Sequence, residues 1–277
     1  MIFKLLLIYF SINTISAVPL KFRDGVSVVP YIVNGTDAKI EEFPFIVSLI
    51  YIYNETLSWH TCGGSILNEY WILTAAHCIY DEEPESYAIE YATTHVTETP
   101  GSFKTRQVEK LIWHEDYDEA NLNDDIGLMK VRSHLDINLF DFKIRLPVRD
   151  AYFATGIPAV LAGWGRIGTG MPISTILQKV DLQIYNQYDC AQIHQPGWLL
   201  YNNICAGVPG GGKGQCNGDS GGPLMSLGVQ VGIVSWSIKP CTVAPYPGVF
   251  TSVAPYVDWI AENSGLNFQL GMFLHSV

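Results

Sequence analysis

Short apolar runs separated by turn-forming residues are the feature that most constrains the fold of this chain. From residue 32 onward, runs rich in Val, Ile, Leu and Tyr are interrupted every ten or so residues by Gly, Pro, Asn or Asp. Clear examples are 45–50, 159–162 and 229–234. Runs of this length and spacing predict an all-β chain, folded as a barrel or a sandwich.

Only the end of the chain has a helical pattern. Ser252 is a suitable N-cap, and Gly265 is a suitable stop. Between them, the apolar residues recur at the spacing of one helix face: Val253, Tyr256, Val257, Ile260 and Ala261. We expect a C-terminal helix that closes before Gly265.

The first seventeen residues have the pattern of a secretory signal peptide. Lys4 precedes the apolar run 5–10, and small residues follow at Ser16 and Ala17. The alternative, a membrane anchor, is disfavoured because a spanning helix needs about 20 apolar residues. We therefore predict that residues 1–17 are a signal peptide and that the protein is secreted and extracellular.

The cysteine count agrees with secretion. The chain has six cysteines, an even number without a CxxC spacing, so disulfides explain them better than a zinc site does. Parity alone leaves fifteen pairings open. The cysteines are Cys62, Cys78, Cys190, Cys205, Cys216 and Cys241.

Composition narrows the classes of partner. With 48% hydrophobic and 16% charged residues, the chain is globular, and its net charge of −11 argues against nucleic acid or an anionic membrane as a partner. Two sequons, at Asn34 and Asn54, fit N-glycosylation of a secreted protein. We predict no metal site and no cofactor.

Three segments supply candidate catalytic groups. Residues 218–223 read Gly-Asp-Ser-Gly-Gly-Pro, which places the hydroxyl of Ser220 in a glycine-rich turn. A serine hydroxyl needs a neighbouring base and donors for the oxyanion that its attack creates. His77, in Leu-Thr-Ala-Ala-His-Cys, and Asp125, in Leu-Asn-Asp-Asp-Ile-Gly-Leu, are the candidates for the base and its partner.

The chain order His, Asp, Ser resembles the chymotrypsin-like family of serine peptidases. The resemblance runs from Ile32 to about Ser264 and includes the segments 32–35, 163–165, 235–236 and 247–250. Residues 68–73 look like those of arthropod digestive peptidases, including mite members known as allergens. The family fold implies two six-stranded antiparallel β-barrels with a C-terminal helix, in a peptidase domain at 32–277 with the boundary between barrels near 145–155.

The resemblance implies a role for each member of the site. His77 is the general base, Asp125 orients it, Ser220 attacks, and the backbone N–H groups of Gly218 and Ser220 bind the oxyanion. Substrate backbone is bound by Ser235, Trp236 and Ser237. The remaining histidines are given no role: His60, His95, His114, His134, His194 and His275.

The family resemblance also implies the disulfide pairs, namely Cys62–Cys78, Cys190–Cys205 and Cys216–Cys241.

Activation by cleavage is a further implication. In the family, the freed N-terminus inserts as a cation against the aspartate before the nucleophile, which here matches Ile32 with Asp219. Residues 18–31 are then an activation propeptide. Tyr31 precedes the cut where most relatives have Arg or Lys, so trypsin should not activate this chain, and the enzyme itself is a candidate activator.

The specificity pocket implied by the family has Gly214 at its floor, Gln215 beside it, and Ser237 and Gly248 on the walls. No carboxylate is available there to pair with Arg or Lys. We therefore expect a chymotrypsin-like preference for Phe, Tyr, Leu or Met before the cut bond. Ser237 replaces a glycine of many relatives and is expected to narrow the entrance.

Two other readings remain. A homologue that has lost catalysis and acts as a binding or decoy protein would keep the fold, and an intact triad argues against it. An esterase or lipase is disfavoured by the chain order and by the absence of a Gly-x-Ser-x-Gly elbow. As a peptidase, the protein is expected to be a monomer that meets protein or peptide substrates and protein protease inhibitors.

Overall fold

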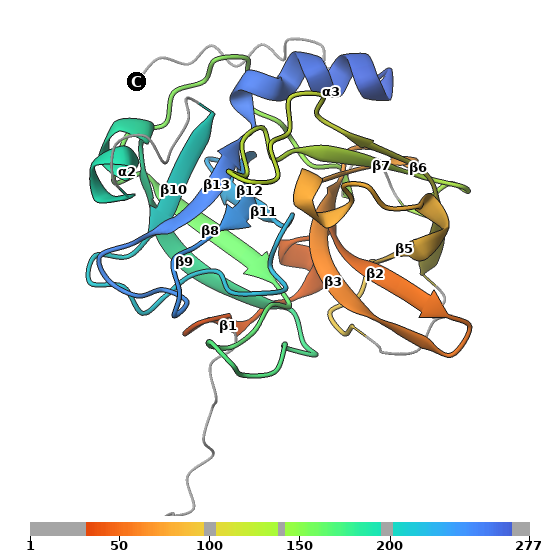
Figure 1. Cartoon of the computed structure of the whole chain (residues 1–277), viewed down its shortest axis with the longest axis horizontal. Helices are drawn as coiled ribbons and strands as arrows, with labels where there is room; N and C mark the ends of the chain where they lie inside the picture. The colour runs from red at the N-terminus through yellow and green to blue at the C-terminus, as the bar shows by residue number, and fades with distance from the viewer. Residues whose placement is uncertain (1–31, 97–103, 138–141, 195–201, 268–277) are drawn as a thin grey trace, which may run out of the picture.

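Two closed antiparallel β-barrels lie side by side in the computed structural model, which describes residues 32–96, 104–137, 142–194 and 202–267 (Figure 1). This confirms the expected all-β fold. The proposed signal peptide and propeptide, residues 1–31, lie outside the described residues, as does most of the C-terminal tail after α3.

The first barrel contains six strands in the closed order β2-β3-β4-β7-β6-β5. A cluster of buried aliphatic and aromatic side chains fills it, including Leu49, Ile72 and Leu128. The expected run at 45–50 lies almost entirely in its first strand. The strands are β2 (Ile46–Asn54), β3 (Leu57–Ile66), β4 (Trp71–Thr74), β5 (Tyr87–Tyr91), β6 (Thr105–Trp113) and β7 (Gly127–Val131).

The second barrel closes because β8 pairs with both β9 and β11. Along β9, alternate side chains point inward, so that Val180, Leu182 and Ile184 are buried while Asp181 is exposed. The runs at 159–162 and 229–234 form its strands as expected. The strands are β8 (Pro158–Gly163), β9 (Gln178–Tyr185), β10 (Asn203–Gly207), β11 (Pro223–Ser226), β12 (Val229–Trp236) and β13 (Gly248–Ser252).

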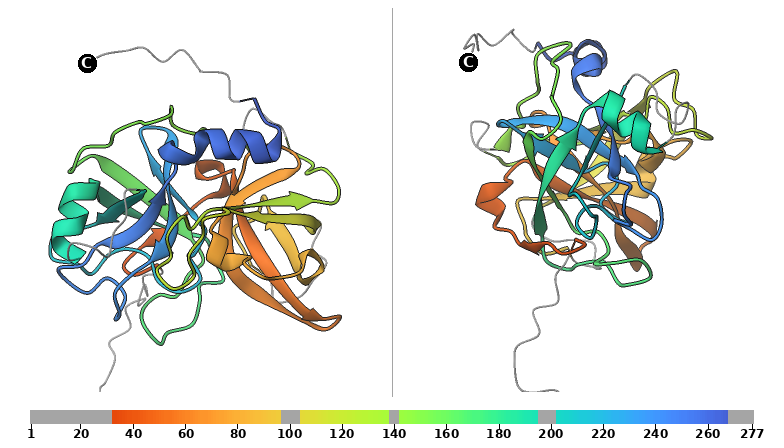
Figure 2. Two further views of the ribbon diagram at one scale, coloured as in Figure 1. Left: turned by 45° about the horizontal axis from the view of Figure 1, so that its top comes forward. Right: turned by 90° about the vertical axis from the view of Figure 1, so that its left-hand side faces the viewer.

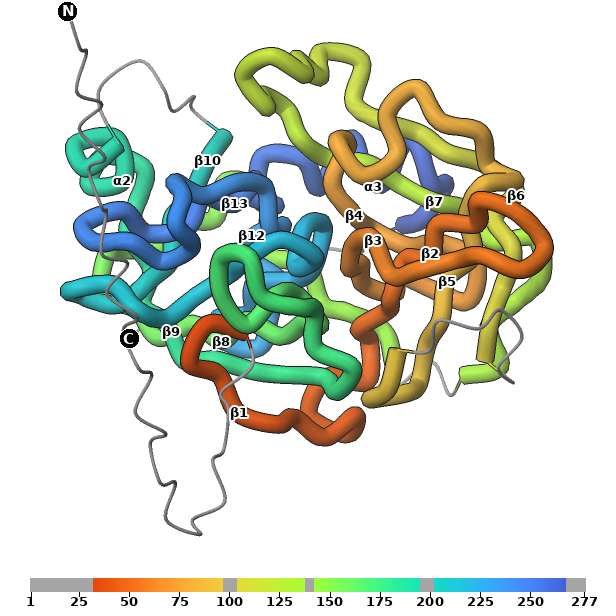
Figure 3. Tube along the Cα trace, turned by 60° about the horizontal axis from the view of Figure 1, so that its bottom comes forward, coloured from red at the N-terminus to blue at the C-terminus, as the bar shows by residue number. Residues whose placement is uncertain are grey.

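A short N-terminal strand joins the outside of the second barrel. The strand β1 (Thr36–Asp37) pairs with β9 next to the loops of this barrel (Figure 3). Just before it, the side chain of Ile32 is fully buried in the core of the second barrel. The described N-terminal end therefore packs against the second barrel, and the chain then continues into the strands of the first barrel.

The helices are short. The sequence predicted the C-terminal helix correctly but placed its N-cap wrongly. The C-terminal helix is confirmed as α3 (Val257–Ser264), preceded by the 3-10 turn η4 (Ala254–Tyr256), and it ends at Gly265 with φ of 69°. The expected N-cap is wrong, because Ser252 still belongs to β13. The helix lies over the junction of the two barrels at the top of Figure 1 and comes forward in Figure 2.

A second helix, α2 (Gln187–His194), was not expected from the sequence. Three further 3-10 turns are η1 (Ile40–Glu42), η2 (Ala76–Cys78) and η3 (Pro84–Ser86). Among the described residues, no helix is both long enough and apolar enough to cross a membrane.

Candidate active site

His77 and Asp125 come from the ends of two paired strands of the first barrel. His77 lies in η2, directly after β4, and Asp125 lies just before β7. Thr74, at the end of β4, is the partner of Gly127, at the start of β7, in the antiparallel ladder. The strand register therefore brings the two segments that carry these side chains to the same end of the barrel.

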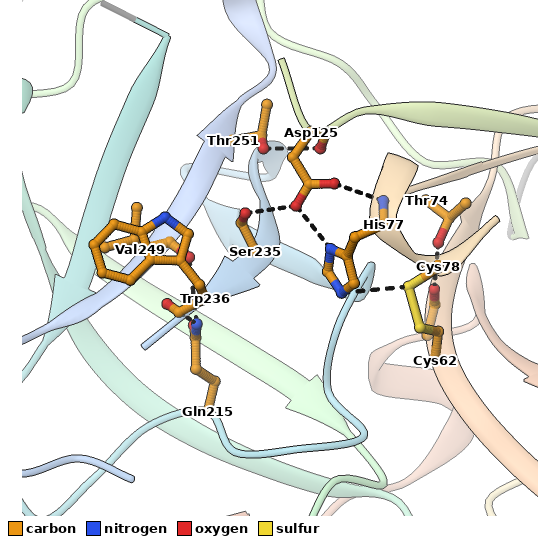
Figure 4. Close-up of polar contacts among 11 residues, drawn as sticks. Cys62, Thr74, His77, Cys78, Asp125, Gln215, Ser235, Trp236, Val249 and Thr251 are labelled. Carbon is orange, nitrogen blue, oxygen red and sulfur yellow. Dashed lines mark hydrogen bonds and ion pairs between the residues drawn. A yellow bond between two sulfur atoms is a disulfide. The ribbon is translucent and has the colours of Figure 1, made fainter. Parts of the chain in front are cut away.

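The carboxylate of Asp125 is fully buried and accepts three hydrogen bonds (Figure 4). Its Oδ1 accepts from the backbone N–H of His77 at 2.9 Å, and its Oδ2 accepts from Nδ1 of the same residue at 2.8 Å. The hydroxyl of Ser235 donates to Oδ2 at 2.5 Å. A buried carboxylate needs such donors to offset its lost hydration, and here both oxygens have them.

These contacts fix the protonation of the imidazole. Since a carboxylate only accepts, Nδ1 of His77 carries hydrogen and Nε2 is left free to take a proton. Burial lowers the pKa of His77, but the charge of Asp125 and the hydrogen bond to it raise that pKa more, so the net shift is upward from 6.5. The geometry is that of a general base held by a carboxylate.

Ser220 lies in the turn that leads into β11. Backbone hydrogen bonds hold this turn: Gly221 N donates to Val234 O at 2.8 Å, and Gly63 N, from the first barrel, donates to Ser220 O at 2.7 Å. Gly221 has φ of +75°, and a Cβ there would lie 2.2 Å from the hydroxyl oxygen of Thr74. Only glycine fits where the turn approaches β4, the strand that leads to His77.

The hydroxyl of Ser220 makes no side-chain hydrogen bond with any described residue. The imidazole Nε2 of His77 instead lies 3.7 Å from the sulfur of Cys78. Hydrogen bonds between nucleophile and base are often long in enzymes without substrate and tighten on binding. The structure thus joins His77, Asp125 and Ser235 in one network, with the nucleophile's turn tied to β3 and β12 beside it.

His60 has a role in the site that the sequence did not reveal. It is buried in β3, its Nδ1 lies 2.7 Å from the hydroxyl of Ser48, and its Nε2 lies 2.8 Å from the carbonyl oxygen of Gly218. Burial lowers its pKa to about 4, so the ring is neutral, and Nε2–H donates to the carbonyl while Nδ1 accepts from serine. The absence of a role for His60 is corrected: it holds the backbone of the proposed oxyanion glycine.

The signal that could have found His60 is strand alternation. In β3, the side chains of Ser58, His60 and Cys62 are buried, and the intervening Trp59 is exposed. A histidine at a buried position of a strand needs polar partners within hydrogen-bond distance. The sequence does not show which partners these are, because Gly218 lies 158 positions away.

Asp219 is the second buried carboxylate, with only 1% of its surface exposed. Its Oδ1 accepts from the backbone N–H of Gly165 at 2.8 Å, and its Oδ2 accepts from that of Cys216 at 2.9 Å. Burial raises its pKa from 3.8 to about 7, against the opposing effect of the two hydrogen bonds and of Lys239. A Cβ at Gly163 or Gly165 would lie 2.3 Å from an atom of this carboxyl group, so both flanking glycines leave room for it.

The segment after the proposed cut lies against the second barrel's loops. The carbonyl oxygen of Val33 accepts from Gly214 N at 3.3 Å, and Asn34 Nδ2 donates to Gly212 O at 2.6 Å. Ile32 is fully buried and has φ of 40°. The described chain therefore begins beside the segment that carries Gly214 and Ser220.

The four residues assigned to the specificity pocket do line a single pocket. It is formed from several loops, and its lining has no carboxylate. Gly214 has φ of +145°, a conformation that L side chains rarely adopt. The lining residues include Gly214, Gln215, Ser237, Gly248, Thr242 and Tyr246.

Three disulfides hold the loops of the site. Cys62–Cys78 joins β3 to the segment of His77, Cys190–Cys205 joins α2 to β10, and Cys216–Cys241 joins two loops around the pocket. These are the pairs that the family resemblance implies. Two Cys and His groups among the described residues have metal-like spacing, but in both the sulfurs are bonded to each other and are not thiolate ligands.

A family match and three similar proteins all point to the same family. The sequence matches the family described as Trypsin over residues 32–260. It is 38% identical over 243 residues to Trypsin-1 of Astacus astacus, which covers 84% of this chain and 100% of that protein. It is also 38% identical over 232 residues to Chymotrypsin-2 of Vespa crabro, covering 84% and 99%. Identity to Trypsin Blo t 3 of Blomia tropicalis is 35% over 268 residues, covering 93% and 97%.

Proposed function

The chain belongs to the trypsin family and is a serine endopeptidase, and from this premise we propose that it hydrolyses peptide bonds through His77, Asp125 and Ser220. The observation that carries the proposal is the buried Asp125 carboxylate, which binds both the backbone N–H and Nδ1 of His77. That arrangement leaves Nε2 as the proton acceptor. These contacts between Asp125 and His77 are made in the absence of substrate.

In the proposed reaction, the Ser220 oxygen attacks the carbonyl carbon, and the proton of Ser220 passes to Nε2 of His77. The imidazolium then gives this proton to the leaving amine, and the acyl group stays on Ser220. Water then gives a proton to His77 and attacks the acyl carbon, and His77 passes that proton to the Ser220 oxygen as the bond between this oxygen and the acyl carbon breaks and the acid is released. The backbone N–H groups of Gly218 and Ser220 bind the oxyanion in both steps.

Activation depends on the second carboxylate. We infer that cleavage between Tyr31 and Ile32 frees an ammonium group that pairs with Asp219. Two facts support this inference: Ile32 is buried beside the loops that carry Asp219, and burial raises the pKa of Asp219 to about 7 despite the opposing charge of Lys239. Residues 18–31 are then the propeptide. Tyr31 suits an uncharged pocket, so a second copy of the enzyme is the proposed activator.

The preference of the enzyme is proposed from the pocket lining. Glycine at 214 and 248 and the absence of a carboxylate in the lining favour apolar or aromatic side chains over Arg and Lys. An uncharged pocket stabilises such a side chain by roughly 25 cal/mol for each Å² of apolar surface that it buries. Ser235, Trp236 and Ser237 are the proposed contacts for the substrate backbone.

Secretion and glycosylation are part of the same proposal. Residues 1–17 are the proposed signal peptide, and a digestive role is proposed from the similarity to the trypsins and chymotrypsin named above. Of the two sequons, Asn54 is the better glycan site. It is exposed in the turn between β2 and β3 and uses only its oxygen, whereas Nδ2 of Asn34 donates to Gly212 O. Protein expressed in insect cells should lose one glycan mass in Asn54→Gln and none in Asn34→Gln.

The test of the proposed function is a cleavage assay on protein prepared with Ile32 as its first residue. Peptides should differ only in the residue before the cut bond, and Ser220→Ala is the blank. We expect cleavage after Phe, Tyr, Leu or Met. Cleavage mainly after Arg or Lys would overturn the pocket assignment, and no cleavage of any peptide would favour a homologue that binds without catalysis.

Activation in trans is tested separately. The Ser220→Ala proform cannot cut itself, so it is the substrate, and mature enzyme is added to it. We expect a cut after Tyr31, detected by mass spectrometry as a new N-terminus at Ile32. An uncut proform would contradict activation by a second copy.

A further inference from the structure

Gln215 has an amide orientation that the structure fixes without ambiguity. Its side chain is buried beside the pocket, and Nε2 donates to Trp236 O at 2.8 Å and to Val249 O at 3.3 Å (Figure 4). Carbonyl oxygens accept hydrogen bonds and cannot donate them. The end of the amide that faces both carbonyls is therefore the NH₂ group, and the other end is Oε1.

That Oε1 atom is buried and has no hydrogen-bond partner among the described residues. It lies against the wall of the pocket at Gly248, since a Cβ at position 248 would be 2.6 Å from it. Buried acceptors without a donor are rare in native proteins because they lose the hydrogen bonds of water without replacement. Because this acceptor lies in the wall of the pocket, a donor on the entering substrate side chain is a candidate partner for it.

The charges around the pocket restrict that donor. Lys213 lines the pocket, and Nζ of Lys239 donates to the hydroxyl of Ser237, another lining residue, at 3.3 Å. A lysine or arginine side chain would enter beside these two cations without a carboxylate to meet it, which is unfavourable. An uncharged donor at the end of an apolar side chain avoids this cost.

The sequence offers such a side chain at the proposed activation site. Tyr31 immediately precedes Ile32, so its phenol would occupy this pocket if the enzyme cuts its own proform. A phenol combines a ring for the apolar part of the pocket with one hydroxyl donor at its tip. This is an observation independent of the amide geometry.

We propose that Gln215 is a specificity-determining residue whose Oε1 accepts a hydrogen bond from the hydroxyl of a substrate tyrosine, so that the enzyme prefers Tyr to Phe before the cut bond. The inference rests on the proposed function and narrows it to one side chain. Asparagine, glutamine and basic side chains are the competing donors. Asparagine and glutamine lack an aromatic ring, and the basic side chains carry a positive charge that the lining disfavours.

The first test uses the unaltered enzyme, with Ile32 as its first residue, on five peptides that differ only at the residue before the cut: Tyr, Phe, O-methyltyrosine, Gln and Asn. We expect kcat/KM to be about three- to tenfold higher for Tyr than for Phe, the range of one net hydrogen bond. O-Methyltyrosine has no donor and should not exceed Phe. Equal rates for Tyr and Phe, or faster cleavage after Gln or Asn than after Tyr, would overturn the inference.

The second test removes the acceptor. Gln215→Met keeps the length of the side chain without the amide, so the ratio of Tyr to Phe should fall to about one while cleavage after Phe persists. Ser237→Gly is the matched control at the pocket entrance, and it should change both rates together and leave their ratio intact. An unchanged ratio in Gln215→Met would overturn the inference. Failure of the unaltered enzyme to cut any peptide would instead refute the proposed function.

Discussion

Asp125 and Asp219 are two fully buried carboxylates, one in each barrel, and they are satisfied in different ways. Asp125 accepts from a backbone N–H, an imidazole and a hydroxyl, all supplied by the folded chain. Asp219 accepts from two backbone N–H groups only, and burial raises its pKa to about 7. The first carboxylate has two side-chain donors, whereas the second has no side-chain donor among the described residues, and the effect of burial on its pKa is opposed by its two backbone hydrogen bonds and the charge of Lys239. In the proposed function, this difference separates a carboxylate that belongs to the catalytic site from a carboxylate that acts as the activation switch.

The largest expected effect comes from the permanent carboxylate. Asp125→Asn presents an amide NH₂ where Nδ1 of His77 donates, which favours the wrong tautomer. We expect kcat to fall about 10⁴-fold with little change in peptide binding. Asp181→Asn, which removes an exposed carboxylate from β9, is the control and should keep full activity. A fall of less than tenfold in Asp125→Asn would mean that Asp125 does not orient His77.

The switch carboxylate should have the next largest effect. In protein that begins at Ile32, Asp219→Asn leaves the new terminus without its anion, and the oxyanion turn loses the contact that sets it. We expect kcat to fall about 10²–10³-fold, the range for loss of one oxyanion donor. The variant assayed in the uncleaved form should match the uncleaved parent, since neither has the ion pair. Full activity in the cleaved Asp219→Asn protein would contradict the proposed role of Asp219 as the activation switch.

A smaller effect is expected at Ser235, one of the three donors to Asp125. Ser235→Ala should lower kcat/KM about 10- to 150-fold, because a hydrogen bond to a charged group contributes about 1.5–3 kcal/mol. Ser226→Ala removes a comparable bond, to Pro158 O, on the far strand β11 and should leave kcat unchanged. Equal losses of activity in both variants would show that the effect is general destabilisation.

The smallest effect is on the pH profile. A protonated His77 cannot accept the proton of Ser220, so kcat/KM must fall as pH drops through the pKa of His77. The net effect of Asp125 holds this pKa above 6.5, despite the opposing effect of burial. We expect the acid limb of the profile to have its midpoint above pH 6.5, measured on a neutral peptide. A midpoint below 6.5 would mean that the carboxylate of Asp125 does not outweigh the effect of burial on His77.

Sequence reasoning recovered what depends on local patterns. The strands at 46–54, 158–163 and 229–236 follow from short apolar runs, and the end of α3 follows from Gly265. The helix α2 was missed because Gln187–His194 has little apolar periodicity, and the disulfide from Cys190 helps to hold it. The start of α3 was misplaced because pairing of Ser252 with Gly232 of β12 extends β13.

In the candidate site too, sequence reasoning found the residues that lie in local motifs and missed the contacts between residues far apart in the chain. Motifs proposed the catalytic residues through the family resemblance, and the same resemblance implied the three disulfide pairs that the structure contains. They did not identify His60 as the support of Gly218, or Ser235 as a donor to Asp125. These contacts join positions 158 and 110 residues apart, and no local pattern in the sequence records them. The unpaired Oε1 of Gln215 likewise depends on the positions of two distant carbonyl groups.

The most direct test of the difference between the carboxylates is the unfolding free energy from pH 4 to 8, measured in a Ser220→Ala background. Two forms are compared: one begins at residue 18 and the other begins at Ile32. An acid whose pKa is raised on folding contributes stability below its unfolded pKa and loses it as pH rises through the folded pKa. The shift of Asp219 from 3.8 to about 7 therefore predicts that the uncleaved form loses up to about 4 kcal/mol between these pH values.

The cleaved form, in which the Ile32 ammonium pairs with the carboxylate, should lose much less over the same range. Asp219→Asn should remove the difference in slope between the two forms. This is the result that the account predicts. Parallel stability curves for the cleaved and uncleaved forms, with Asp219 present, would contradict it.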